Sequence, residues 1–349
     1  MGTAERATPA TGGNERNDDE LSDGTIVAEK AAATGAARPQ PPAEGISEPT
    51  PAPTPAPTPA PAPTGASGGA GGAEPRGSRA GRNLPAALAV GTTLGMLCIA
   101  VLLFVPKVFI GVAGVAVGIA TWEVAKRLRE ADVLVPRTPL IVGGQAVFWL
   151  GWPFGPGGVT GAFAATALVC MVWRLFDHGL RTAPRNFLRD TAITVFTLAW
   201  IPLLASFAVL LLLEEPDGNL RVLTFMILVV CSDVGGYVAG VLFGRHPMVP
   251  SISPKKSWEG FCGSLVFAII GGLLTVTLLL EANSMIGVVL GIGLVVVATL
   301  GDLVESQIKR ELGIKDMGTM LPGHGGIMDR LDSMLPSAFV SWLVLSTLL

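Results

Sequence analysis

The sequence predicts an all-α, polytopic helical integral membrane protein with about nine transmembrane helices and a disordered N-terminal tail. Half of its 349 residues are hydrophobic, 15% are charged and only 6% are aromatic. The apolar character therefore comes from aliphatic residues and glycine, which is typical of helical membrane proteins and unusual for a soluble domain. Apolar runs that approach the thickness of a bilayer recur from residue 84 to the C-terminus.

The N-terminal tail, residues 1–82, differs from the rest of the chain in composition. It is rich in Ala, Pro, Gly and Thr and contains the run PAPTPAPTPAPAPT from Pro51 to Thr64. Such a segment cannot bury enough apolar surface to offset the entropy lost on ordering. No short apolar core lies near its start, so we expect no signal peptide. The chain is therefore predicted to consist of a disordered Pro/Ala/Gly-rich cytoplasmic tail, 1–82, and a transmembrane domain, 83–349.

Nine apolar runs are the candidates for membrane helices. A helix needs about 20 residues to cross a bilayer, so the shorter runs are marginal, and the third and the last are the weakest. Glycine is frequent inside the runs, as expected where helices pack closely. The runs are 84–105, 108–125, 139–155, 157–176, 190–213, 221–243, 261–280, 284–301 and 334–349.

The basic residues predict how the chain is oriented. Of the 24 Lys and Arg residues, all except Lys107 and Arg221 lie in the tail or in alternate loops between the runs. The positive-inside rule then places the N-terminus and these loops in the cytoplasm and the C-terminus outside. We expect a multi-pass protein of the cell (plasma) membrane. No basic stretch interleaved with aromatic residues suggests a nucleic acid as a partner.

The segment from Gly301 to Ser333, between the last two runs, contains two kinds of ligand-binding group. Its carboxylates can hold a hard cation such as Mg²⁺, which prefers oxygen ligands. Its basic side chains and bare glycine amides can hold phosphates. The presence of both kinds of group beside a bilayer predicts phosphoryl or nucleotidyl chemistry on a lipid. The groups are Asp302, Glu305, Asp316, Asp329 and Asp332, then Lys309, Arg310, Lys315, His324 and Arg330, and the turn from Pro322 to Gly326.

The acidic residues of this segment form two pairs, each with a spacing of three. Asp302 and Glu305 lie at the end of one run, and Asp329 and Asp332 at the start of the last helical stretch. Each pair alone is also compatible with a solvated helix end or a cap, but together they bracket a loop that can fold back, which favours a metal cluster. His324, flanked by glycines, has no apolar face to pack on, which favours a phosphate contact or a proton donor.

Two further segments carry candidate residues. Asp233 lies inside an apolar run, where a carboxylate is costly and usually functional, although a structural contact between helices is the alternative. Tyr237, four residues later, shares its helix face. The loop 244–261 holds three prolines and is predicted to be irregular and non-helical. Its Lys255 and Lys256, with nearby serines such as Ser257, can donate to a triphosphate or can be ordinary cytoplasmic charges.

These residues resemble the phosphatidate cytidylyltransferase family, the CDP-diacylglycerol synthases. The family signature runs from Ser-x-aliphatic-Lys-Arg, through Lys-Asp, to Pro-Gly-His-Gly-Gly and Asp-Arg-x-Asp, and residues 306–332 match every specified position. The segments SDVGGYVAG, SPKKSWEG and GDLVES resemble its companion motifs. The resemblance covers about residues 84–349. It implies a metal-dependent nucleotidyltransferase of phospholipid biosynthesis that transfers CMP from CTP to phosphatidate, giving CDP-diacylglycerol and pyrophosphate.

The resemblance also implies roles for individual residues and partners. CTP, phosphatidate and membrane lipids are the expected partners, and Mg²⁺ or another hard divalent cation is the expected cofactor. A second, monovalent cation and a homodimer are left open by the sequence. The expected metal ligands are Asp302, Asp329 and Asp332. The expected catalytic residues are these three with His324, Lys309, Arg310 and Arg330. The expected substrate-binding residues are Ser232, Asp233, Tyr237, Lys255, Lys256, Ser257, Lys315, Asp316, Gly323, Gly325 and Gly326.

Two other functions fit the sequence less well. A CDP-alcohol phosphatidyltransferase needs a DGxxAR pattern, which this sequence does not contain. A transporter that used Asp233 as an ion site would concentrate polar residues at mid-bilayer, often in repeated halves. Here the polar residues crowd one end of the runs, and no internal repeat is visible.

Overall fold

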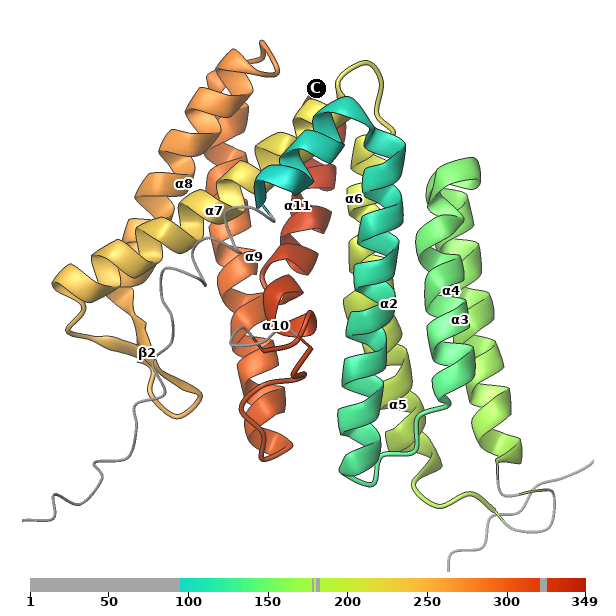
Figure 1. Cartoon of the computed structure of the whole chain (residues 1–349). Helices are drawn as coiled ribbons and strands as arrows, with labels where there is room; N and C mark the ends of the chain where they lie inside the picture. The colour runs from blue at the N-terminus through green and yellow to red at the C-terminus, as the bar shows by residue number, and fades with distance from the viewer. Residues whose placement is uncertain (1–94, 178, 180–182, 321–324) are drawn as a thin grey trace, which may run out of the picture. The chain divides into compact units, whose positions relative to one another are not determined.

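The computed structural model describes residues 95–177, 179, 183–320 and 325–349. The predicted disordered tail therefore lies outside the described residues. The described part is built from helices, joined in one place by a short β-hairpin (Figure 1). Its elements are the helix Gly95–Phe104, α2 Pro106–Glu130, α3 Arg137–Trp149, α4 Gly151–Phe176, α5 Phe187–Leu198, the π-helical turn η1 Ala199–Leu203, α6 Leu204–Leu212, α7 Gly218–Phe243, β1 Pro247–Val249, β2 Ser253–Ser257, α8 Trp258–Leu278, α9 Ser284–Glu311, α10 Met328–Leu331 and α11 Met334–Leu348.

The helices confirm the prediction of an all-α, polytopic membrane protein. In the part of the chain that the structure describes, 7 helices are long and apolar enough to cross a membrane. Two of them are composite, because α5, η1 and α6 form one span and α10 and α11 form another. The two remaining predicted runs correspond to the 13-residue α3 and to the 10-residue helix 95–104, whose run begins before the described residues.

The boundary between the third and fourth runs differs from the prediction. The sequence suggested a break near residue 156, whereas α3 ends at Trp149 and α4 begins at Gly151. Gly155 and Pro156 instead kink α4, with Gly155 at a left-handed φ of 58°. Proline lacks the N–H that an α-helix needs and clashes with the preceding turn, and glycine tolerates positive φ. The pair therefore bends one helix and does not separate two.

The helices enclose two hydrophobic clusters. One consists mainly of residues from α2 to α6 and includes Phe148 and Ile201, both fully buried. The other joins α6, α7, α8, α9 and α11 and includes Leu228 and Leu294. Figure 1 shows α2 to α5 grouped together, α7 and α8 tilted away from them, and α9 and α11 between the two groups.

Close glycine contacts hold α7, α8 and α9 against one another, as the glycine content of the runs predicted. Gly272 of α8 meets the backbone of Gly287 in α9 so closely that a Cβ on either residue would overlap the other's backbone. On the other side of α8, a Cβ at Gly235 of α7 would lie 2.6 Å from the carbonyl oxygen of Gly263. Small residues at such crossings let membrane helices approach closely.

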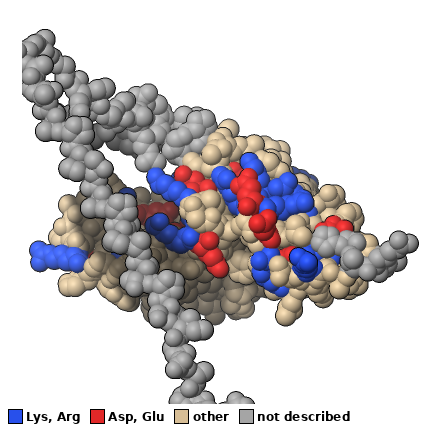
Figure 2. Space-filling view, turned by 90° about the horizontal axis from the view of Figure 1, so that it is seen from below, with Lys and Arg blue, Asp and Glu red and all other residues tan. Residues whose placement is uncertain are grey.

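The four connections that have basic residues within them or at the adjoining helix ends lie at one end of the bundle (Figure 1). They are the described residues of 131–136, 177–186, 244–257 and 312–327, and the basic residues of the first lie in the flanking ends of α2 and α3. Figure 2 views this end, where Lys and Arg side chains gather together with Asp and Glu. The alternation of basic loops in the sequence thus corresponds to one surface of the molecule.

A buried ion pair joins α4 to α5 at this end. Arg174 Nη2 lies 2.9 Å from Asp190 Oδ2, and the two side chains are only 2% and 1% exposed. Arg174 Nη2 also donates to the carbonyl oxygen of Arg185 at 2.7 Å. Arg189 contacts the other oxygen of Asp190 at 2.9 Å. The charges of Arg174 and Asp190 are therefore compensated inside the protein.

Candidate active site

A cavity of about 440 Å³ opens between α7, the hairpin, α8, α9 and α10. It lies at the end of the bundle that carries the basic loops, and its walls come from segments distant in the sequence. Most of the predicted site residues line it. These are Ser232, Asp233, Tyr237, Lys255, Lys256, Ser257, Asp302, Asp329, Arg330 and Asp332.

One wall of the cavity is the last part of α7. Asp233 and Tyr237 both line the cavity, which confirms that their spacing of four places them on one face. Tyr237 is 73% exposed, whereas Ser232 is buried and its carbonyl oxygen accepts from Ser264 Oγ of α8 at 2.6 Å. Gly236 lets α8 approach, since a Cβ there would lie 2.5 Å from Ser264 Oγ. The α7 motif thus serves helix packing and the cavity together.

The loop between α7 and α8 forms the second wall. It is non-helical as predicted, but the irregular loop expected from its prolines is an antiparallel hairpin of β1 and β2. The hairpin is closed by Glu259, whose Oε1 lies 2.6 Å from His246 Nδ1 and whose Oε2 accepts from the backbone N–H of Arg245 and His246. Ser257 Oγ caps α8 by accepting from the backbone N–H of Gly260 at 3.1 Å.

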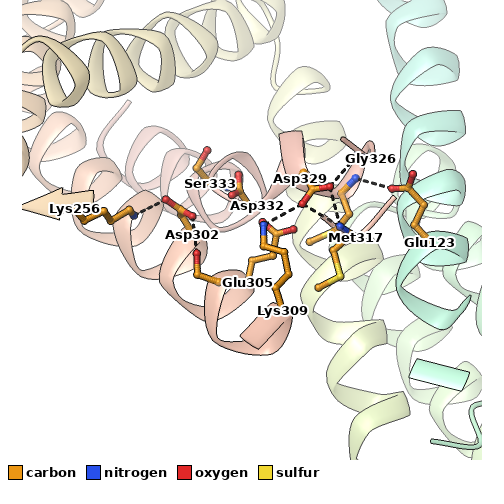
Figure 3. Close-up of polar contacts among 12 residues, drawn as sticks. Glu123, Lys256, Asp302, Glu305, Lys309, Met317, Gly326, Asp329, Asp332 and Ser333 are labelled. Atoms are coloured by element: carbon orange, nitrogen blue, oxygen red, sulfur yellow. Dashed lines mark hydrogen bonds and ion pairs between the residues drawn. The ribbon is translucent and has the colours of Figure 1, made fainter. Parts of the chain in front are cut away.

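Lys256 and Asp302 connect the hairpin to α9. Lys256 Nζ lies 2.6 Å from Asp302 Oδ2, and Ser306 Oγ donates to Asp302 Oδ1 at 3.3 Å (Figure 3). The Asp302 side chain is 34% exposed, so it is accessible from the cavity. Asp332 Oδ1 accepts from the backbone N–H of Ser333 at 2.6 Å. Asp233 lines the same cavity as Asp302 and Asp332, which places three carboxylates around one space.

Asp329 has a different environment from Asp302. Its oxygens accept from Lys309 Nζ at 3.0 Å, from the backbone N–H of Met317 at 3.0 and 3.2 Å and from that of Gly326 at 2.8 Å (Figure 3). A carboxylate has about four lone-pair sites, so these donors occupy nearly all of them. Asp329 therefore holds the two ends of the glycine-rich loop to α10 and to α9.

The remaining predicted residues lie around this centre. Lys309 bridges Asp329 and Glu305, 3.3 Å from Glu305 Oε2. Arg310 does not line the cavity, and its Nε donates to the carbonyl oxygen of Ile252 in the hairpin turn at 3.3 Å. Lys315 and Asp316 are exposed on the loop, and Gly325 adopts a left-handed φ of 82° beside Asp329. Gly323 and His324 lie outside the described residues.

The described residues contain no group of three His, Cys, Asp or Glu side chains close enough to hold one metal ion. Asp302 and Asp332 nevertheless reach the same cavity and offer oxygen ligands, which are those that Mg²⁺ prefers. Magnesium is commonly bound by one or two carboxylates, with waters and substrate phosphates completing the shell. The donor set therefore fits a hard divalent cation that binds together with a phosphate-bearing substrate.

The comparison with known proteins decides the family. A model of the cytidylyltransferase family matches residues 86–348. The chain belongs to this family. It is 53% identical over 279 residues to the phosphatidate cytidylyltransferase of Mycobacterium bovis, covering 78% of this chain and 91% of that protein. The Mycobacterium tuberculosis H37Rv protein of the same name is 53% identical, with 78% and 85% covered. The Mycobacterium leprae protein is 52% identical over 281 residues, with 77% and 90% covered.

Two residues of this cytidylyltransferase-family chain were not among the candidates although they contact the signature loop. Glu123 of α2 is only 2% exposed, and its Oε2 accepts from the backbone N–H of Met328 at 3.0 Å. Arg127 Nε donates to the carbonyl oxygen of Met317 at 2.9 Å. Glu123 lies inside the predicted run 108–125. The same signal that pointed to Asp233, a carboxylate within an apolar run, identifies it.

Proposed function

We propose that the chain transfers CMP from CTP to phosphatidate, giving CDP-diacylglycerol and pyrophosphate. The observation that carries the proposal is the cavity, in which lysines of the hairpin face carboxylates of α9 and α10 at one end of membrane helices. A lipid whose tails stay in the bilayer can present its phosphate at that depth. The names of the mycobacterial relatives, which match most of this chain, support the same reaction.

The proposed chemistry needs no nucleophile from the protein. An oxygen of the phosphatidate phosphate attacks the α-phosphorus of CTP, and the bond between that phosphorus and the oxygen bridging to the β-phosphate breaks. Pyrophosphate leaves with the bonding electrons. The protein's task is to hold two polyanions in line and to neutralise the charge that develops on the leaving group. Lys255, Lys256 and Arg330 line the cavity and supply the positive charge for this task.

A hard divalent cation such as Mg²⁺ fits the carboxylates of this site. Asp302 and Asp332 would hold it, with Asp302 sharing its oxygens between the ion and Lys256. Asp329, the third predicted ligand, would have to release one of its present donors to bind the ion. When bound, the cation neutralises phosphate oxygens and stabilises the departing pyrophosphate. Lys309 keeps Asp329 and Glu305 compensated beside the cavity.

We further propose that the protein lies in the cell membrane and that the end of the bundle with the basic loops faces the cytoplasm. The support is the positive-inside distribution of Lys and Arg, together with the position of the cavity at that end. CTP is a cytosolic nucleotide, so a cavity on this side has direct access to it.

The test is turnover of labelled CTP by the purified full-length chain in micelles containing phosphatidate. The expected products are CDP-diacylglycerol and pyrophosphate in equal amounts, with loss of turnover on chelation of divalent cations. Asp302→Asn should abolish turnover. Glu311→Gln, an exposed carboxylate at the end of α9 that does not line the cavity, is the matched control and should leave it intact. Turnover of a CDP-alcohol donor with release of CMP, or no CTP turnover at all, would reject the proposal.

A further inference from the structure

Helix α2 contacts both ends of the loop that carries the glycine-rich turn. Glu123 Oε2 accepts from the backbone N–H of Met328, where the chain returns from the loop. One helical turn later, Arg127 Nε donates to the carbonyl oxygen of Met317, where the loop begins. The two side chains are four residues apart and therefore share one face of α2. We call this pair of residues the α2 clamp.

Between these two bonds, the loop closes on itself at a neck formed by Gly318 and Gly326. A Cβ added at Gly326 would lie 2.7 Å from the backbone nitrogen of Gly318 and 2.5 Å from Glu123 Oε2. A Cβ added at Gly318 would overlap Glu123 Oε1. The Glu123 carboxylate thus packs directly against the backbones of Gly318 and Gly326, and a side chain at either glycine would not fit.

Burying the Glu123 carboxylate costs folding free energy, and a specific role would account for this cost. Its side chain is 2% exposed, and within the described part of the chain its Oε1 has no hydrogen-bond partner. A buried polar atom without a partner lowers stability, and a carboxylate in a membrane helix adds to that cost. Glu123 also does not line the cavity. Its contacts are with the neck of the loop, so a role there accounts for it.

The same backbone is held from the opposite side by Asp329. The backbone N–H groups of Met317 and Gly326 both donate to Asp329 (Figure 3). The carbonyl oxygen of Met317 accepts from Arg127 Nε. Asp329 lines the cavity together with Arg330 and Asp332. A displacement of the neck would therefore move a wall of the cavity.

We propose that Glu123 and Arg127 are positioning residues for nucleotidyl transfer, which hold the neck of the signature loop against α2. They act through Met317, Met328 and Asp329 and do not touch the substrates. The proposal rests on the proposed function only for its kinetic readout, because the order of the loop is measurable without turnover.

The test compares Glu123→Ala, Glu123→Gln and Arg127→Met in the full-length protein, with Lys126→Ala as the matched control on the exposed side of the same turn. Two quantities are measured: kcat and KM for CTP, and amide hydrogen exchange of residues 313–320 and 325–328. Glu123→Ala should lower kcat/KM at least tenfold and accelerate exchange at Met317, Gly318, Gly326 and Met328. Glu123→Gln keeps an oxygen for the Met328 N–H and should recover kcat/KM to within about threefold. Lys126→Ala should change neither.

The result that overturns the clamp is a Glu123→Ala protein with unchanged exchange in the loop, whatever its activity. If Gln is as inactive as Ala while the loop stays protected, the negative charge acts on the reaction and the positioning role is wrong. Should Glu123→Ala fail to insert, Arg127→Met decides, because unchanged exchange at Met317 and unchanged kcat/KM would reject the clamp. Absence of CTP turnover by the unmodified chain would instead reject the proposed function, and the exchange data would still decide on the clamp.

Discussion

A carboxylate in the signature loop can order the loop or bind the metal ion. Replacing Asp329 by Asn distinguishes these two roles. The Asp329 side chain is only 5% exposed and accepts from Lys309, Met317 and Gly326. Asn retains one acceptor oxygen, so at least one backbone N–H or the Lys309 ammonium loses its partner. Lys309 still has Glu305 as a partner at 3.3 Å, and a buried donor left without its partner costs about 1–3 kcal/mol. Each kcal/mol corresponds to about 2–4 °C for domains of 150–250 residues, so the melting temperature should fall by roughly 2–12 °C.

Asp302→Asn provides the contrast. The Asp302 side chain is 34% exposed and that of its partner Lys256 is 26% exposed. Partly exposed pairs of this kind contribute about 0–1 kcal/mol, so the melting temperature should change by no more than about 4 °C. Both substitutions should lower turnover at least about 100-fold, because each removes a carboxylate predicted to bind the metal or to shape its site.

The assay combines thermal unfolding in detergent, followed by tryptophan fluorescence, with CTP turnover on phosphatidate. Glu311→Gln should leave both quantities unchanged. If Asp329→Asn melts at the temperature of Asp302→Asn while losing turnover, Asp329 is dispensable for the order of the loop, and its contacts with Met317 and Gly326 do not stabilise the fold.

Three further predictions concern topology, the tail and helix packing. In a chain without its native cysteines, Arg129→Cys and Met320→Cys should be labelled from the cytoplasmic side and Glu281→Cys from the other side; reversed labelling at position 320 would refute the orientation. Deletion of residues 1–75 should leave the specific activity of purified enzyme within about twofold, and a loss above tenfold with insertion intact would contradict the interpretation of the tail as an appendage. Gly287→Ala should lower the melting temperature, because its Cβ overlaps the α8 backbone; an unchanged melting temperature would show that α8 and α9 can separate without cost.

The sequence was sufficient for the number and type of the helices because each span must bury its own backbone polar groups in the bilayer. Apolar length therefore reports directly on structure, and the alternation of basic loops identified which connections share a surface. The exception was the Gly155–Pro156 pair, where a proline signal marked a bend inside α4. Whether such a signal ends a helix or kinks it depends on packing from other helices, which a single sequence does not contain.

The candidate site was predicted less completely, for a physical reason. Spacing along the chain placed Asp233 with Tyr237 and suggested that the acidic pairs converge. It could not distinguish Asp302, open to the cavity, from Asp329, whose oxygens are occupied by backbone donors. Arg310 was expected at a phosphate, and its Nε donates to the carbonyl oxygen of Ile252. Such partners come from segments that are distant in sequence. Many of them are backbone N–H and C=O groups, which nearly every residue type carries, so the residue identities do not reveal them.

The buried pair of Arg174 and Asp190 has a consequence for how the chain enters the membrane. Its members are separated by 16 residues and belong to consecutive helices, so the pair needs no later part of the chain in order to form. A lone arginine or aspartate is expensive to transfer out of water, whereas a compensated pair is much less so. Helices α4 and α5 can therefore leave the translocation machinery as a preassembled hairpin whose charges are already matched, ahead of the helices that form the cavity.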